Sequence, residues 1–536
     1  MTPGRRAQTA TPDLWDHLKV DAADQTAPVD ALISPEMEPP TVVESRFDRR
    51  DLFRNVAAVA GLLGAGAVVA ACDMVQNTTD PQLHLLRRVT YGLDASSITR
   101  IRAVGTAAWL DEQLDPARLD TSAVEAKVAL LTHVNASFAA LKGAAESGEV
   151  GSQVRLAAVI RQVESPAQLF ERMVELWSDH LNVPITDNRS GLLKTIEDRA
   201  VIRPRALGRF ADLLVASAKS PAMLVYLDNA VSVKAAPNEN YARELLELHT
   251  VGVGNFTEAD VVATARLLTG WTVNSTTGEF VFRSANHDSR SVSMLGWTRP
   301  TSGTALSHGE AYLTHLARHP ATARMVATKI ARRFATDMPP ANLIDDLAAV
   351  YTANDTAIVP VLRALFGHPA FTGATNTKFR RPIDWVVASA RALGATMAAT
   401  TDSRLGQVGT AVSGMGQLPF GWPAPNGYPD VEGAWLTTGG LLSRWNLAGD
   451  LVARRIGIID VPIDSLRDGL AGRSTNDAVA ILADRVLHEP LTAGGRQVII
   501  GHSGLGGVAR LSALQVNQLV TAVVPLLLAS PDFQYR

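Results

Sequence analysis

Apolar residues recur at helical spacing through nearly the whole chain from Gln82 onward, and this pattern limits the fold more than any other feature. The segment from Ser165 to Leu181 illustrates it. Ser165 and Pro166 are typical of a helix start, because serine can cap the first turn and proline needs no N–H partner there. One apolar stripe then follows at helical spacing, formed by Leu169, Met173, Leu176 and Trp177. The periodicity predicts a mainly α fold, a globular body of many helices.

Two regions depart from helical periodicity. Residues Gly270 to Phe282 alternate in polarity around a Thr-Thr-Gly turn, which predicts a small β-hairpin inserted at about 270–296. The segment from Gly416 to Trp435 has too many prolines and glycines for a helix, so we expect a long loop. Its aromatic residues either form a contact surface or pin the loop to the core; they are Phe420, Trp422, Tyr428 and Trp435.

The sequence around Arg49 and Arg50 predicts export. These two arginines, followed by Leu52, Phe53 and Arg54, resemble a twin-arginine signal. The uncharged stretch 56–71 is shorter than the about 20 apolar residues of a membrane span and suits a signal peptide better. It ends at Cys72 in a sequence that resembles a lipobox. We therefore expect a lipoprotein that is exported by the twin-arginine route and anchored to the membrane through lipid on Cys72.

These features divide the chain into four parts. Residues 1–47 are rich in Pro, Asp, Thr and Ala without a period, so we expect disorder. Residues 48–71 form the predicted signal peptide, 72–81 a linker and 82–536 the helical body. The 47 residues before the signal are unusually many, so Met37 is an alternative start to Met1.

Composition excludes several classes of function. The formal net charge is −3 and no basic stripe is present, which argues against a nucleic-acid partner. Cys72 is the single cysteine, so the chain cannot form an internal disulfide or a multi-cysteine zinc site. Hydrophobic residues make up 46% of the chain, which is ample for a large core.

The stretch NENYARELLELHTVG, residues 238–252, is the strongest candidate for a site. With Asn238 as cap and Gly252 as terminator, it predicts an amphipathic helix. Its polar face carries Glu239, Asn240, Arg243, Glu244 and Glu247, and His249 lies on the apolar side. We expect the polar face to be partly buried and to line a cleft with His180 or His287. The alternative is a solvated helix face held by weak ion pairs.

Several segments, taken together, resemble one bacterial family. The stretch NENYARELLELHTVGVGNFTEADV followed by ARLLTGWTV is similar to the signature of the domain of unknown function 1800 family. Similar segments run in the family's order through nearly all of residues 82–536, with Leu181 replacing the family's usual aromatic residue. The resemblance implies a mostly helical exported protein and an exported partner of alkaline-phosphatase-like fold, but no particular activity.

Two hypotheses of function remain open at this point. In the first, the chain is an envelope hydrolase with Glu244, Glu247 and His180 as catalytic residues and Arg243, Asn240 and Trp271 binding substrate. A divalent metal is optional in this hypothesis, because carboxylates and imidazoles are suitable ligands. The residues assigned to it are Glu239, His249, His287 and Asp288. In the second, the chain is a non-catalytic helical module that binds an exported partner or a surface polymer.

Overall fold

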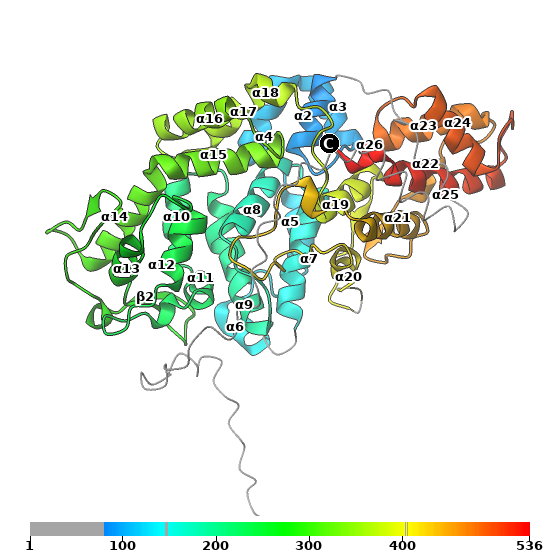
Figure 1. Ribbon diagram of the computed structural model, residues 1–536. Coiled ribbons are helices and arrows are strands. Elements are labelled where there is room, and N and C mark those ends of the chain that lie inside the picture. Colours follow the sequence, from blue (N-terminus) through cyan, green and yellow to red (C-terminus); the bar gives the residue numbers. More distant parts are fainter. Residues whose placement is uncertain (1–79, 145–147, 403, 405) are drawn as a thin grey trace, which may run out of the picture.

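Helices make up most of the molecule, as the periodicity predicts (Figure 1). The computed structural model describes residues 80–144, 148–402, 404 and 406–536. Within these ranges the strands form only three antiparallel sheets of two strands each. No helix in the same ranges is long and apolar enough to cross a membrane. The predicted signal, with Arg49, Arg50 and Cys72, lies outside the described residues, as do residues 1–47.

Aspartate caps begin several helices in the first part of the body. The side chains of Asp80, Asp94 and Asp187 each accept hydrogen bonds from first-turn N–H groups. The elements here are α2 (Pro81–Val89), α3 (Ala95–Val104), α4 (Thr106–Leu114), η3 (Pro116–Arg118), α5 (Ser122–Val128), α6 (Phe138–Ala144), α7 (Glu149–Glu164), α8 (Gln168–His180) and α9 (Asn188–Glu197).

Helix α8 begins two residues later than the sequence predicts. Ala167 has φ −83° and ψ 59°, which is outside the helical range, so Pro166 precedes the helix. The Ser165 hydroxyl accepts a hydrogen bond from the Ala167 N–H, at 3.2 Å. The predicted apolar stripe is confirmed, because all four of its side chains are buried.

The middle of the chain contains two short π-helical turns and the candidate site. Its first elements are η5 (π, Asp198–Ile202), η6 (Arg203–Arg205), α10 (Phe210–Ala218), α11 (Pro221–Tyr226), η7 (Asn229–Val231), α12 (Asn240–Glu244), η8 (π, Leu245–His249), α13 (Glu258–Leu267) and η9 (Ser284–Asn286). The helices that follow are α14 (Ala305–Arg318), α15 (Pro320–Phe334), α16 (Ala341–Ala353), α17 (Ile358–Gly367) and α18 (Pro369–Thr372).

The predicted hairpin is confirmed. Strand β1 (Trp271–Val273) pairs with β2 (Phe280–Phe282), with Trp271 opposite Phe282. A second hairpin follows, formed by β3 (Ser293–Met294) and β4 (Trp297–Thr298). The third pair joins β5 (Thr396–Met397) to β6 (Ile459–Asp460), which are far apart in the sequence and carried no local signal.

The last part of the chain, at the right of Figure 1, packs around a second apolar core to which α5 and α7 also contribute. It contains α19 (Pro382–Ala392), α20 (Gln407–Ser413), η10 (Glu432–Ala434), α21 (Thr438–Val452), α22 (Ile463–Arg467), α23 (Thr475–Leu487), α24 (Ala493–Ser503), α25 (Ala513–Ala529) and α26 (Pro531–Gln534). Every residue of α19 is buried, and in Figure 1 this helix lies in the middle of the molecule.

Buried ion pairs join this core to the larger core on the left. Arg172 on α8 contacts Asp384 on α19, with Nη1 and Oδ1 3.2 Å apart and both side chains fully buried. Arg381 reaches back to Asp179 on α8 at 2.9 Å. Buried charges are costly unless they are paired, so these contacts fix how the two halves meet.

Candidate functional site

The candidate segment starts as an α-helix and ends as a π-helix. Helix α12 begins at Asn240 with Glu239 in the cap position, one residue after the predicted cap Asn238, whose Oδ1 accepts a hydrogen bond from the Asn240 N–H at 2.9 Å. Helix α12 then widens into the π-turn η8, and the Thr250 hydroxyl donates to the Leu245 carbonyl oxygen at 2.6 Å. Gly252 follows at φ +83°, in the left-handed region expected of a helix terminator. The prediction of a single regular α-helix is therefore wrong from Leu245 onward. Single π-turns inside helices occur frequently at functional sites.

Arg243 is held by a neighbouring helix. Its Nη1 and Nη2 donate to the two carboxylate oxygens of Glu258 on α13, each at 2.7 Å. Its Nη2 also lies 3.7 Å from Glu239. The guanidinium group of Arg243 was predicted to bind a substrate carboxylate or phosphate, but it already pairs with the carboxylate of Glu258. The structure therefore gives Arg243 a role in fixing α12 against α13.

Glu244 and Glu247 lie one turn apart and are both half-buried. Neither carboxylate makes a hydrogen bond or an ion pair with any described residue. Burial, together with the charge of Glu247, raises the pKa of Glu244. The face is thus partly buried, as expected, and it holds two carboxylates without a direct ion pair among the described residues, although the nearby charge of Arg243 partly offsets the rise in the pKa of Glu244.

Tyr226 connects this pair to a neighbouring pocket. Burial, and to a smaller extent the charge of Glu244, raise the pKa of Tyr226 to about 12. The Tyr226 hydroxyl donates to the Pro423 carbonyl oxygen at 2.7 Å. The pocket that Tyr226 borders has a volume of about 150 Å³. Its walls are Val183, Pro184, Thr186, Asp187, Arg189, Ser190, Leu193, Ala222, Val225 and Tyr226.

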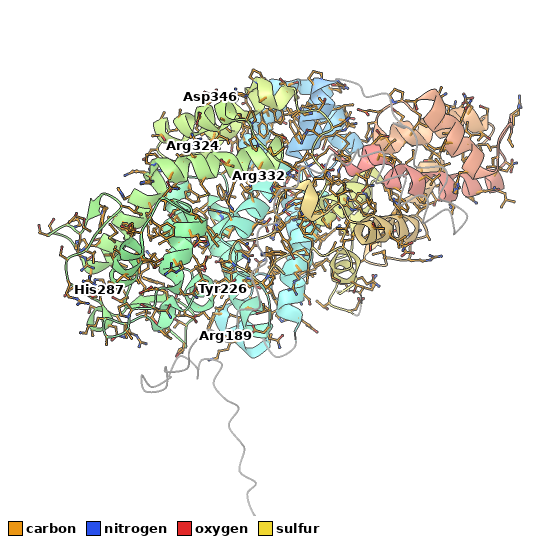
Figure 2. The ribbon with its side chains drawn as sticks, viewed as in Figure 1. Arg189, Tyr226, His287, Arg324, Arg332 and Asp346 are labelled. Atoms are coloured by element: carbon orange, nitrogen blue, oxygen red, sulfur yellow. The ribbon has the colours of Figure 1, made fainter. Side chains whose placement is uncertain are left out.

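Tyr226 and this pocket were missed by the sequence analysis. Figure 2 shows Tyr226 and Arg189 near each other at the lower middle of the body. The walls come from α9, α11 and the loop between α8 and α9, so no single motif contains them. The sequence carried no signal that could have joined these segments.

His180 lies against the buried side of the candidate segment, away from the glutamates. Its Nε2–H donates to the His249 carbonyl oxygen at 3.1 Å, and its ring packs against those of Trp177 and Phe210. Burial lowers the pKa of His180 well below its usual range and that of His249 to about 3. The predicted cleft between His180 and the glutamate face is not observed, because His180 contacts the segment from its buried side. The predicted catalytic grouping with Glu244 and Glu247 is not observed either, because the contacts of His180 are with His249 and the aromatic core.

The four predicted metal ligands are not brought together. No group of three or more His, Cys, Asp or Glu side chains among the described residues is arranged to hold a metal ion. His287 instead bonds to the Thr269 carbonyl oxygen and to Arg299, each at 2.9 Å. Asp288 pairs with Arg266 at 2.8 Å and with Arg290 at 2.5 Å. Figure 2 places His287 near the hairpin, away from Tyr226.

Two predicted substrate-binding residues have different surroundings. Trp271 is fully buried, and a side chain at Gly309 of α14 would collide with its indole, so it belongs to the core and cannot reach a substrate. That prediction is wrong because the hairpin turns its first residue inward. Asn240 is exposed, and its amide lies 3.5 Å from Asp228. It remains available at the edge of the glutamate face.

The loop from Gly416 to Trp435 packs against this region. Asn182 donates to the carbonyl oxygens of Trp422 and Ala424, at 2.9 and 2.7 Å. The Tyr428 ring contacts the rings of Trp422 and Trp435, at centroid distances of 5.1 and 5.8 Å. The observed contacts pin the loop to the body, which was one of the two predicted roles of these aromatic residues.

Together these features define a mainly α protein with a half-buried glutamate pair on a widened helix and a separate pocket that Tyr226 borders. The chain belongs to the family described as "Protein of unknown function (DUF1800)", whose model matches residues 84–535. No curated protein and no solved structure matches the chain.

Proposed function

We propose that this protein is an exported, lipid-anchored hydrolase of the cell envelope that uses Glu244 and Glu247 as an acid–base pair. One observation carries the proposal: two half-buried carboxylates one turn apart have no partner among the described residues, and the pKa of Glu244 is raised. A carboxyl group with a raised pKa keeps its proton to a higher pH than an ordinary glutamic acid and can act as a general acid, and a neighbouring carboxylate can activate water.

The chemistry matches cleavage of an ester or a glycosidic bond. In either reaction the leaving oxygen needs a proton, and Glu244 is the group of the pair for which a raised pKa is indicated. Glu247 would then act as base toward water or as a nucleophile, as paired carboxylates do in glycoside hydrolysis. The pocket bordered by Tyr226 offers a place for a substrate group beside the pair.

The activity is tested on the full chain with chromogenic nitrophenyl esters and glycosides and with isolated cell-wall polymer. Glu244→Gln keeps the shape of the side chain but removes its proton transfer, so we expect a loss of about 10²–10⁴-fold in kcat. Glu247→Gln should also lose activity. The matched control is Glu239→Gln on the same face, whose side chain is more exposed and lies near Arg243. Equal activity of all three variants and wild type would refute the acid–base assignment.

The proposed location is supported by the sequence from Arg49 to Cys72. Replacing Arg49 and Arg50 by lysines should trap the precursor in the cytoplasm. Cys72→Ala should abolish lipid labelling while leaving export intact. Normal export of the double-lysine variant would rule out the twin-arginine route, and this outcome is independent of the result for Glu244.

A second candidate function is binding without catalysis, and the apolar surface near the site favours it. Val253, just after the π-turn, is 76% exposed, and Val262 on α13 is 42% exposed. Exposed valines beside half-buried glutamates suit a partner surface that combines apolar and basic groups. The partner proposed from the family resemblance is an exported protein of alkaline-phosphatase-like fold. Loss of its co-purification in a Val253→Asp variant, without turnover of any substrate by wild type, would favour this function.

A further inference from the structure

Four arginines from distant parts of the chain meet in the interior. Arg88 is on α2, Arg172 on α8, Arg380 just before α19, and Arg536 follows α26. Arg88, Arg172 and Arg536 are 0% exposed, and Arg380 is 4% exposed. We call these four residues the arginine cluster. Arginine is almost never fully buried without a partner, so such a group needs an explanation.

Direct contacts tie the four side chains to one region of the interior. Arg172 and Arg536 contact the same carboxylate, that of Asp384, at 3.2 and 3.4 Å. Arg380 donates to the Tyr535 carbonyl oxygen at 2.6 Å, directly before Arg536. Arg88 donates to the Thr377 hydroxyl at 3.1 Å, and the neighbouring residue Lys378 pairs with Arg536 through the backbone.

The cluster has far more positive than negative side-chain charge. Among the described residues, Asp384 is the only carboxylate within ion-pair distance of any of the four arginines, and it also lies 3.7 Å from Arg381. Arg88 and Arg380 have no carboxylate partner in the described part of the chain and donate only to neutral oxygens. Asp384 alone cannot neutralise four buried guanidinium groups, and the carboxylates of Asp337 and Asp430 act on the cluster only from beyond ion-pair distance.

Several guanidinium nitrogens also lack a hydrogen-bond partner. Within the described residues they are buried and unpartnered at Arg88 Nε and Nη1, Arg172 Nε and Nη2, Arg380 Nε, and Arg536 Nε and Nη1. Burial and the neighbouring charge of Arg172 lower the pKa of Arg536 to about 9, and burial lowers those of Arg88 and Arg380 well below their usual range. A guanidinium group keeps its proton at neutral pH, so these N–H groups stay charged and lack an acceptor among the described residues.

We propose that the arginine cluster binds a small inorganic anion, which is chloride, as a structural ligand in the interior. The surplus of buried N–H donors and positive charge is what an anion would satisfy. Asp384 lies among the same side chains, and its negative charge repels a doubly charged anion such as phosphate or sulfate more strongly than it repels chloride. The site is separate from the Glu244–Glu247 pair and does not depend on the proposed catalysis.

The proposal is tested by thermal unfolding of the full chain at constant ionic strength. Sodium gluconate is replaced stepwise by sodium chloride, and sodium phosphate forms a parallel series. We expect Tm to rise with the logarithm of chloride concentration once that concentration exceeds Kd, by on the order of 3 °C at a hundredfold excess over Kd, because a ligand that binds only the folded state stabilises it. Identical Tm values in chloride and gluconate would overturn the proposal, and a rise with phosphate alone would overturn the assignment of chloride.

Two further measurements locate the effect. Arg88→Met should lose the chloride-dependent rise, whereas Arg324→Met on the exposed face of α15 should keep it; the Arg324 side chain is 55% exposed. If Arg88→Met does not fold, crystals of the wild-type chain grown in sodium bromide decide the question. An anomalous bromide peak among the four arginines would support the site. Its absence there would overturn it.

Discussion

His180 donates its Nε2–H to the backbone carbonyl oxygen of His249, 3.1 Å away, and the two imidazole rings meet edge to face. The contact joins the last turn of α8 to the end of the π-turn η8. A π-turn leaves backbone carbonyl groups without the regular helical partner, and His180 satisfies one of them. The two histidines therefore hold the candidate helix in place from its buried side, while its glutamates remain on the other.

The burial of His180 and His249 predicts that acid lowers the stability of the fold. Burial lowers the pKa of His249 to about 3 and that of His180 well below the ordinary value of about 6.5. Below pH 6.5 the unfolded chain binds protons that the folded chain does not, so stability falls as pH decreases from about 6.5 toward 3. Each histidine contributes a slope of up to about 1.4 kcal/mol per pH unit. Urea unfolding of the full chain between pH 7.5 and 4 measures it.

The matched variant is His249→Leu, which has similar volume and keeps the backbone carbonyl that accepts from His180. It should unfold with a shallower pH dependence than wild type, because one titrating group is gone. A slope equal to that of wild type would mean that His249 is not the group responsible.

The contacts of Asp384 predict that the buried ion pairs between the two cores contribute strongly to the stability of the fold. It is fully buried and contacts Arg172, Arg381 and Arg536, which hold the pKa of its carboxyl well below the usual range despite burial. Asp384→Asn should cost about 3–5 kcal/mol, because it leaves buried guanidinium groups without their counter-charge. The measurement is the free energy of unfolding in urea at fixed chloride concentration.

The control for Asp384 is Asp460→Asn, which breaks a surface pair with Arg454. Both of those side chains are more than half exposed, at 64% and 59%. An exposed pair contributes at most about 1 kcal/mol. If the two substitutions had equal costs, the buried pairs would not be what joins the cores.

The helices and the first hairpin could be predicted because their signals are local. The stripe that contains Leu169 and Trp177 has a period that only a helix satisfies, and both residues are buried. The π-turn at Leu245–His249 could not be predicted, since its amino-acid sequence is equally compatible with an α-helix. It is stabilised by contacts from elsewhere, including His180.

The candidate site was only partly predictable for the same reason. Glu244 and Glu247 follow from helical spacing, and the structure places them on one half-buried face. The role of Arg243 depends on its contact with Glu258, and that of Trp271 on its packing against Gly309. Both partners lie on other helices. A pattern within one helix carries no information about such partners.

The close approach of Gly309 to Trp271 predicts that the packing between α14 and the hairpin does not tolerate a larger side chain at position 309. A Cβ at this position would lie 2.5 Å from Cζ2 of Trp271, which is buried and cannot move aside. Gly309→Ala should therefore destabilise the fold by about 1–3 kcal/mol. Gly449→Ala is the control, because it is also helical but has open space at the Cβ position. It should stabilise by about 0.5–1 kcal/mol, since alanine favours a helix over glycine. Thermal unfolding compares the two, and a stabilising Gly309→Ala would contradict the packing.

The raised pKa of Glu244 predicts that a variant without this carboxylate gains stability while it loses activity. Its folded-state pKa is raised, so its ionised form is less favourable in the folded than in the unfolded chain. Glu244→Gln should therefore increase the free energy of unfolding at pH 7, within about 1 kcal/mol. The gain should shrink as pH falls below the pKa of the carboxyl, where wild type is protonated too.

Glu239→Gln supplies the comparison, because Glu239 is exposed and lies 3.7 Å from Arg243. That variant should lose a few tenths of a kcal/mol or stay unchanged at pH 7. Residues kept for catalysis often lower stability, whereas residues kept for structure raise it. A Glu244→Gln variant that is more stable but inactive would thus identify a site maintained for function. One that is less stable than wild type would show that the carboxylate has a structural partner, and the acid–base proposal would then fail.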